Sequence, residues 1–355
     1  MNKLYKRYLF REFASTVIFF LLSFYTLYIV IDAMAHIDLI AKHPQASLWL
    51  SFYTASFFKR LDILLPFAVA LSSCRVCNKM QQNGEIVALL ASGISKKALL
   101  RPLVLVTLLF ITTVFFSYEW GLPRAITFID HVEAHTFHKT KKSDPLPGLN
   151  EIMLDDNSKL VFSDFDIEKK EFYNIFWIRS ANKIYYIKKL DFSTKYPTGY
   201  YVEHILRNPS QVLEKVSSFE KWEFKTLKID ENTVKNSLVP LSKQKLSNLF
   251  SQFQLYVTSN SPKASSIKAY LFHKALFPFL SFFALLYPCY FFLQFRRSQP
   301  ILLVSLFTLS LLFGYSLLLH AGYVLARFQV LLPSVAIFTP WLLLSGYTFT
   351  QHRKL

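Results

Sequence analysis

Residues 81–95, QQNGEIVALLASGIS, lie between two long apolar stretches and are themselves too polar to cross a bilayer. Glu85 begins a run of apolar residues at helical spacing and Gly93 ends it, which is typical of a short helix. The residues that define this element are Asn83, Gly84, Glu85, Ile86, Leu89, Leu90, Ser92 and Gly93. We predict a small amphipathic helix on the membrane surface between two spans, suited to receiving force from a soluble partner. The alternative interpretation is a plain cytoplasmic connector with a capped turn.

The composition is that of a membrane protein. The chain of 355 residues is 52% hydrophobic and 17% aromatic, which excludes a disordered chain and an ordinary soluble protein. The formal net charge of +17 could indicate nucleic-acid binding. However, much of the Lys and Arg flanks apolar segments, which is the pattern of a topology signal. We therefore predict a membrane protein with no nucleic-acid partner, whose basic character suits anionic lipid head groups.

Three spans are predicted in residues 1–120, around the short helix. The first covers residues 13–34, and cations at positions 3, 6, 7 and 11 place its start in the cytoplasm. It is long enough to span and no small-residue cleavage site follows it, so we interpret it as a retained helix rather than a signal peptide. The second is built from residues 48–58 and 61–74, and the third covers residues 102–120.

The second span is interrupted by Lys59, Arg60 and Asp62. Charges at membrane depth are costly when they face lipid, so these side chains are expected to face the bundle interior or a cavity. Alternatively, the helix begins at the outer interface, where Lys59 and Arg60 can reach the head groups. Both interpretations remain open from the sequence.

Residues 121–265 have a different character, with shorter apolar runs and more charges. Runs rich in Tyr, Phe, Val and Ile occupy residues 160–165, 172–179, 183–190, 200–206 and 222–229. Turn residues separate these runs, as in a β-sandwich or jelly roll. Residues 121–142 are expected to continue the third span as a helical stalk. By alternation of sides the domain is extracytoplasmic.

Residues 266–355 predict three further spans, at 267–295, 301–323 and 330–349, with a very tight turn at residues 298–300. Cations are in excess on the inner side, so both termini are expected in the cytoplasm. The predicted fold is a membrane α-helical protein with six spans in a three-plus-three arrangement and an inserted extracytoplasmic, all-β, jellyroll-like domain. Its predicted parts are residues 1–120, 121–265 and 266–355.

The sequence lacks several common catalytic and nucleotide-binding motifs. It contains no GxxxxGK[ST], GxSxG, HExxH or dinucleotide fingerprint, so we predict a non-enzyme without cofactor or metal. His131, His135 and His138 have helical spacing, but in a basic stalk they are interpreted as a solvated face. Cys74 and Cys77 form a CxxC, interpreted as small apolar residues that face neighbouring helices rather than as a redox or metal site.

The segment of residues 83–95 resembles the coupling helix of the LptF/LptG family. The members of this family are the permease subunits of the lipopolysaccharide-export ABC transporter. Arg7-Tyr8-Leu9 with Arg11-Glu12 is similar to the family's opening before its first helix. Pro278 within the fourth span, followed by residues 296–300, RRSQP, resembles the tight turn before its fifth span. The resemblance covers all six spans and is weakest in the middle region.

The resemblance implies a bacterial inner-membrane protein in a heterodimer with a paralogous permease, LptF or LptG. An LptB-type ATPase dimer would lie beneath the pair and receive Glu85 in a groove. The outer domain would pass lipopolysaccharide to an LptC-type protein and a periplasmic bridge. Lipid would enter the central cavity sideways, between helices one and five of opposite subunits.

One position departs from the family pattern. Many G-type members carry a lysine near the outer end of the first helix, where this chain has Ile29 with Asp32 close by. The candidate lipid-phosphate or cavity contacts, chosen on charge, are Asp32, Lys59, Arg60, His273 and Lys274. The short C-terminus favours the G type and the opening favours the F type, and between the two we favour the G type.

Two function classes follow from these observations. The first is an ABC permease subunit that extracts lipopolysaccharide and is driven by a separate ATPase. The alternative is a non-transporting membrane scaffold or signalling protein whose β domain binds a partner. A membrane enzyme acting on lipids is disfavoured because no catalytic set is present.

Overall fold

The computed structural model divides into two compact units, Met1–Lys139 with Ser265–Leu355, and Thr140–Ala264. We describe each unit by itself. The residues that the structure describes are 4–42, 45–136, 150–154, 156, 158–166, 169–180, 182–193, 196–208, 212–225, 227, 234, 237–238, 239–257, 261–293 and 300–352.

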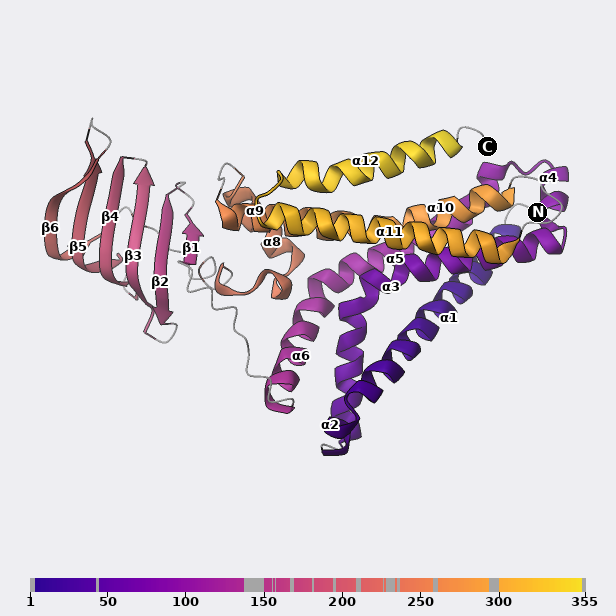
Figure 1. The fold of residues 1–355 in the computed structure, drawn as a ribbon, viewed down its shortest axis with the longest axis horizontal. Coiled ribbons are helices and arrows are strands. Elements are labelled where there is room, and N and C mark those ends of the chain that lie inside the picture. Colours follow the sequence, from indigo (N-terminus) through magenta and orange to yellow (C-terminus); the bar gives the residue numbers. More distant parts are fainter. Residues whose placement is uncertain are drawn as a thin grey trace. The chain divides into compact units, whose positions relative to one another are not determined.

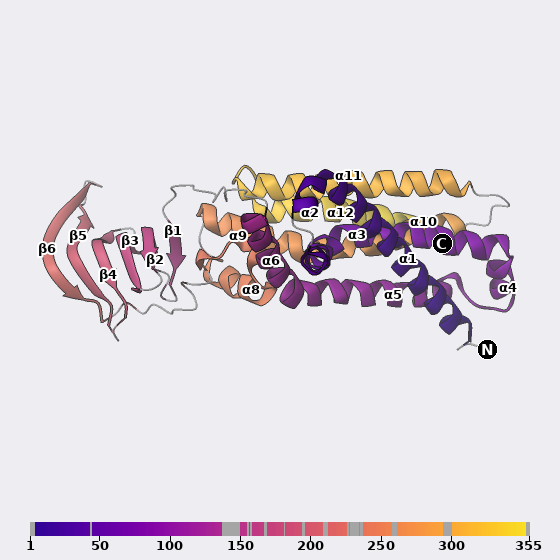
Figure 2. The same cartoon turned by 90° about the horizontal axis from the view of Figure 1, so that it is seen from below.

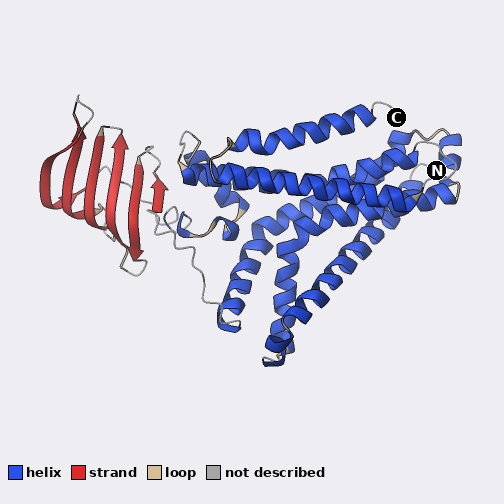
Figure 3. Ribbon diagram, in the orientation of Figure 1, coloured by secondary structure: helices blue, strands red, loops and turns tan. Residues whose placement is uncertain are grey.

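The first unit is helical throughout its described residues (Figures 1 and 3). Its first half contains α1 (Leu4–Ala35), α2 (Ile37–Lys42), α3 (Ala46–Gln82), α4 (Glu85–Ala91), α5 (Lys96–Phe116), the π-helix η1 (Ser117–Gly121) and α6 (Leu122–Thr136). Its second half contains α9 (Pro262–Leu276), the 3-10 turn η3 (Phe277–Phe279), α10 (Leu280–Leu293), α11 (Ile301–Arg327) and α12 (Pro333–His352).

Among the described residues, 5 helical stretches are long and apolar enough to cross a membrane, and the apolar part of α12, Pro333–Gly346, is shorter. The predicted class, a helical membrane protein with an inserted β domain, is therefore confirmed. The expected continuation beyond the third span is present as α6, which the contacts assign to the helical unit. The tight turn expected at residues 298–300 lies largely outside the described residues.

Helix α3 is the centre of the helical unit, because it packs against α1, α5, α6, α10 and α11. Its buried stretch is rich in Ala, Val and Ser, and small side chains let neighbouring backbones approach closely. The hydroxyls of Ser72 and Ser73 donate to carbonyls of their own helix at 2.6 and 2.7 Å, so both are satisfied without water. The Sγ atoms of Cys77 and Cys289 lie 3.5 Å apart in the contact with α10. Both thiols are buried and free, in agreement with a packing role.

Two helical stretches bend, namely α3 and the continuous stretch formed by α5, η1 and α6 (Figures 1 and 2). Pro66 lies inside α3, and a proline in a helix interior removes a hydrogen bond and kinks the helix. The second bend falls at η1, where a π-turn interrupts the regular hydrogen bonding between α5 and α6. Beyond η1, α6 runs transversely to α5 and packs on the first half of α3 through Trp49, Phe52 and Ile129.

The second unit contains one antiparallel sheet whose strands follow sequence order, β1-β2-β3-β4-β5-β6 (Figure 1). The strands are β1 (Asn150–Met153), β2 (Lys159–Asp166), β3 (Glu171–Ser180), β4 (Lys183–Asp191), β5 (Thr198–Arg207) and β6 (Leu213–Glu223). In the described residues the sheet does not close, so the jellyroll-like domain has the connectivity of a meander. The 3-10 turn η2 (Leu241–Lys243) and helix α8 (Leu246–Leu255) follow it.

One face of the sheet carries the core of the β unit. This core contains Ile152, Leu154, Leu160, Phe162, Phe172, Ile175, Trp177, Ile187, Leu190, Val202, Phe224, Leu227 and Val234. Phe172 and Ile175 are three residues apart and both buried, although strict alternation would point them to opposite faces. Between them Asn174 has a φ of 49°, a left-handed conformation that asparagine tolerates. Tyr201 has a φ of 53° and lets Gly199 and Val202 share the core face in the same way.

Four of the five predicted strand segments coincide with β2 to β5. The fifth, residues 222–229, is wrong in position, because β6 ends at Glu223. Strand β6 begins earlier, in a segment whose side chains are almost all exposed on both faces, so it lacks the apolar run that marks a covered strand.

Replacing Gly199 with alanine is expected to destabilise the β unit by about 1–3 kcal/mol, a typical cost of overpacking. A Cβ at this position would lie 2.7 Å from Phe224 and 2.9 Å from Val202. Limited proteolysis of the purified full chain during a thermal ramp measures the effect. The matched control is Gly314→Ala on α11, where a Cβ meets nothing within 4 Å. Equal protease resistance of the two variants would contradict the expectation.

Candidate functional site

The short helix predicted between the second and third spans is confirmed as α4. Positive φ angles at Gly84 (70°) and Gly93 (85°) set its two ends. The amide of Ile94 donates to the carbonyl of Leu89 at 3.1 Å and that of Gly93 to Leu90 at 3.0 Å, which is the Schellman pattern of a glycine-terminated helix. Ser95 then caps α5 by accepting a hydrogen bond from the amide of Ala98 at 3.2 Å. The connections on both sides of α4 are therefore short and well defined.

The side chains of α4 divide into an anchoring set and an exposed set. Ile86 is 4% exposed and holds the helix against the body of the unit, whereas Val87 is 45% exposed. Leu89 and Leu90 are half-buried, and Ser92 is exposed. Ile86, and not Val87, is among the residues predicted to define this element. The structure instead turns Ile86 inward and gives the outward apolar position to Val87.

Glu85 lies at the start of α4, where its carboxylate is held by two neighbours. Asn83 Nδ2 donates to Glu85 Oε1 at 3.0 Å, and the hydroxyl of Tyr8 on α1 interacts electrostatically with Glu85. Close by, Lys79 Nζ lies 2.7 Å from Glu12 Oε1 and links the end of α3 to α1. This ion pair is partly exposed, and such pairs contribute about 0–1 kcal/mol. The start of α1, the end of α3 and α4 thus meet at one place.

Two of the predicted lipid contacts come together between α1 and α3. The guanidinium of Arg60 lies 3.8 Å from the centre of the Tyr28 ring, and the Tyr28 hydroxyl donates to Asp32 Oδ1 at 2.9 Å. His36 Nδ1 lies 3.7 Å from Asp32 Oδ2. Lys59, the residue before Arg60 on α3, is exposed. The cluster is therefore a polar contact between two helices that combines one carboxylate with one guanidinium.

The other two predicted contacts lie elsewhere. Lys274 is 4% exposed, with Nζ 4.9 Å from the centre of the Tyr118 ring and 5.0 Å from that of Tyr270. The Tyr118 hydroxyl donates to Asp62 Oδ2 at 2.9 Å, and Asp62 and Lys274 attract each other electrostatically. Among the described residues Lys274 Nζ has no hydrogen-bond partner. Lys274 is therefore buried beside two aromatic rings, and its role as a lipid-phosphate or cavity contact, chosen on charge alone, stays a prediction. Its neighbour His273 packs on the ring of Phe277 at 5.1 Å.

The Asp62–Tyr118–Lys274 cluster lies at a constant depth along three helices. Asp62, Tyr118 and Lys274 are each about 20 residues from the α4-side ends of α3, α5 and α10, or about 30 Å at ~1.5 Å per residue. This length matches the hydrocarbon thickness of a bilayer, about 30 Å. The cluster is thus separated from the α4-side end of the bundle by about the length of helix that crosses a bilayer. Tyr118 was missed in the sequence because the candidates were chosen on charge and tyrosine carries none; it lies on η1, a π-turn that the sequence does not indicate.

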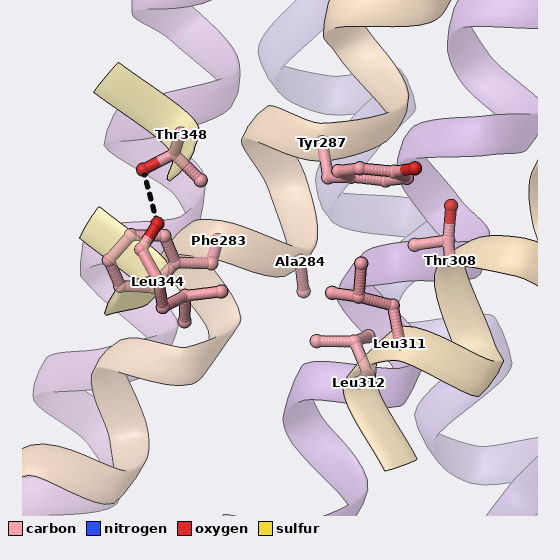
Figure 4. Close-up of a pocket in the computed structure, with 8 residues that line it drawn as sticks. All are labelled: Phe283, Ala284, Tyr287, Thr308, Leu311, Leu312, Leu344 and Thr348. Carbon is pink, nitrogen blue, oxygen red and sulfur yellow. Dashed lines mark hydrogen bonds between the residues drawn. The ribbon is translucent and has the colours of Figure 1, made fainter. Parts of the chain in front are cut away.

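A groove and a small void are among the cavities of the helical unit. The larger is an apolar groove of about 750 Å³ between α1, α3, α5, η1 and α6. Phe57, Phe58, Phe110 and Trp120 contribute aromatic walls, and Arg124 is the one charged side chain among the described lining residues. The smaller cavity, about 10 Å³, lies between α10, α11 and α12 (Figure 4). It has room for one water molecule at most, so it is a packing void.

The described residues contain no group of three or more His, Cys, Asp or Glu side chains that could hold a metal ion. The side chain of His135 and the whole of His138 lie outside the described residues, so the histidine spacing in the stalk stays a prediction about a solvated face.

Long apolar helices, a short polar-surface helix between two of them and an inserted β domain define a multi-pass membrane protein. The family model described as "Lipopolysaccharide export system permease LptF/LptG" matches residues 7–351, and the chain belongs to this family. The predicted resemblance is thereby confirmed, and the chain is a lipopolysaccharide-export permease rather than an enzyme. Among curated proteins, none matches the sequence.

Proposed function

We propose that this chain is a transmembrane subunit of an ABC transporter that extracts lipopolysaccharide from the bacterial inner membrane. A separate LptB-type ATPase dimer supplies the work. The observation that carries the proposal is α4, a seven-residue helix fixed by capped glycine turns directly between α3 and α5. A helix held in this way transmits displacement to both long helices, because neither connection has slack.

Glu85 and Val87 are the positions on α4 that we assign to the ATPase. Glu85 supplies a carboxylate at the start of the helix, and Val87 supplies exposed apolar surface for a groove. Leu89 and Leu90 support the same face from half-buried positions. ATP drives transport only if it binds more tightly to the arrangement in which the ATPase dimer is closed and α4 displaced.

The lipid cavity is proposed to form with a paralogous permease, LptF or LptG. Asp32 and Arg60 lie together at the α1–α3 contact, and a guanidinium suits bidentate binding of a lipid phosphate. Lys59 is the exposed cation nearby in sequence. We assign these three residues to the cavity, and we assign Lys274 and His273 to the packing of the subunit.

The β unit is proposed to lie in the periplasm and to receive the lipid, with both termini of the chain in the cytoplasm. Strand β6 pairs only with β5 in the described sheet, so its other edge is open to an LptC-type protein or to the next module of the bridge. Phe219 and Trp222 continue the apolar core face onto β6, with ring centres 4.2 Å apart and both side chains exposed. Such a strip can contact acyl chains.

A photo-crosslinking amino acid at position 222 is expected to form an adduct with lipopolysaccharide when the chain is co-expressed with its ATPase and partner permease. The yield should rise severalfold with ATP, because ATP drives delivery to the β unit. The matched control is position 221, whose lysine packs over Tyr200 on the opposite face, 5.8 Å from the ring centre. An absence of adduct at position 222 in an ATP-hydrolysing complex would favour a scaffold without lipid passage.

A further inference from the structure

The apolar groove between α1, α3, α5 and α6 has the dimensions of a ligand site. Its volume of about 750 Å³ falls within the range of small-molecule and cofactor pockets. Small residues shape its floor: a Cβ on Gly121 would lie 3.0 Å from Phe58. Thr54 and Thr113 line it with hydroxyls that donate to carbonyls of their own helices, at 2.7 and 2.9 Å, and so leave an apolar surface.

The depth of the groove can be counted along α5. Arg101 and Gly121 are about 20 residues apart, or about 30 Å of helix, which equals the hydrocarbon thickness. Arg124 follows on the first turn of α6, so it lies at the head-group level opposite Arg101. Trp120 is 55% exposed and stacks on Phe116 at 5.8 Å, as expected of an aromatic residue at a membrane interface.

Charge and shape therefore define a matching ligand. Long aromatic and aliphatic walls suit acyl chains, and an exposed guanidinium at the head-group end suits a phosphate. Because the described lining carries one cation, it matches a lipid with one phosphate. A lipopolysaccharide carries more phosphates and more acyl chains than this lining can match.

We propose that this groove binds one anionic phospholipid, with its acyl chains between Phe57, Phe110 and Trp120 and its phosphate on Arg124. The lipid is a constituent of the subunit and not its cargo. The groove lies beside the bends at α3 and η1, which are visible in Figure 1. The proposal does not depend on ATPase coupling or on lipopolysaccharide passage.

The test uses the purified full chain in phosphatidylcholine nanodiscs with a small fraction of brominated lipid, which quenches tryptophan fluorescence on contact. The quenching of Trp120 is obtained as the difference in quenched fluorescence between the parent chain and the Trp120→Phe variant. Brominated phosphatidylglycerol is expected to quench Trp120 about fivefold more effectively than brominated phosphatidylcholine, since one basic residue near a surface contributes ~1 kcal/mol.

Variants separate a built site from general lipid contact. Arg124→Gln should abolish the preference for phosphatidylglycerol, whereas Arg327→Gln, an exposed cation at the end of α11 outside the groove, should retain it. Thr113→Phe should weaken quenching by both lipids because it fills the groove. Thr112→Phe, at the neighbouring exposed position outside the described lining, should not.

Mass spectrometry of the gently extracted chain gives an independent reading. One phosphatidylglycerol per parent chain and none per Arg124→Gln chain is expected. Equal quenching by the two brominated lipids in the parent, or a preference that survives Arg124→Gln, would overturn the proposal. Retention of lipopolysaccharide in place of phospholipid would also overturn it, because the groove would then be part of the cargo route.

Discussion

Glu85→Arg is expected to abolish ATP-driven lipopolysaccharide release while the chain still inserts and assembles with its partner permease. The carboxylate is presented at the first turn of α4 by Asn83 and Tyr8. A hydrogen bond to a charged group contributes about 1.5–3 kcal/mol, so its loss weakens ATPase binding about 10- to 100-fold. Reversal of the charge adds repulsion, and the effect should exceed that of Glu85→Gln.

Proteoliposomes containing the complete transporter allow both quantities to be measured, namely ATP hydrolysis and lipopolysaccharide release. Glu12→Gln is the matched control, because Glu12 is an acidic residue at the same end of the bundle whose exposed pair with Lys79 contributes little. Release by the Glu85→Arg transporter at the parent rate would remove α4 from the transmission of force.

Lys274→Ala is expected to lower the free energy of unfolding of the helical unit by about 1–3 kcal/mol, because the desolvated Asp62 loses the cation that attracts it. The substitution leaves Asp62 as a carboxylate near Tyr118 with no compensating cation in the cluster. Such a penalty comes mainly from the charge that stays behind. The double variant Lys274→Met with Asp62→Asn should therefore recover most of the lost stability, although it removes both charges.

Unfolding in mixed detergent micelles measures these differences. Lys59→Ala is the control, since Lys59 is an exposed lysine on α3 only three residues from Asp62 and should change the stability by less than about 0.5 kcal/mol. A Lys274→Ala chain as stable as the parent, or a double variant less stable than either single variant, would show that Asp62 and Lys274 are not energetically coupled.

The helical framework could be predicted because its signals are local. Span length, flanking cations and the Asn83-Gly84 and Gly93 breaks are visible in short windows, and α4 appears where they indicate. The strands β2 to β5 were visible for the same reason, as short apolar runs between turns. The exposed β6 lacked that signal, so its position was misjudged.

The orientation of single side chains could not be predicted, because it depends on neighbours distant in the chain. Ile86 faces inward only because the body of the unit lies on that side of α4. Lys274 is buried because α9 packs beside a π-turn that the sequence does not announce. The groove and Arg124 depend on two helix bends, and Pro66 indicated only one of them.

The two glycines around α4 make this segment a replaceable adaptor. Their positive φ angles fix where the helix starts and stops, and most residues other than asparagine or aspartate would cost about 1–2 kcal/mol there. Between them, Ile86 alone is fully buried, so the remaining positions are free to diverge without loosening the frame. A chain built in this way can change which motor protein it fits by exchanging a few outward residues, and the lipid-handling parts need not change with them.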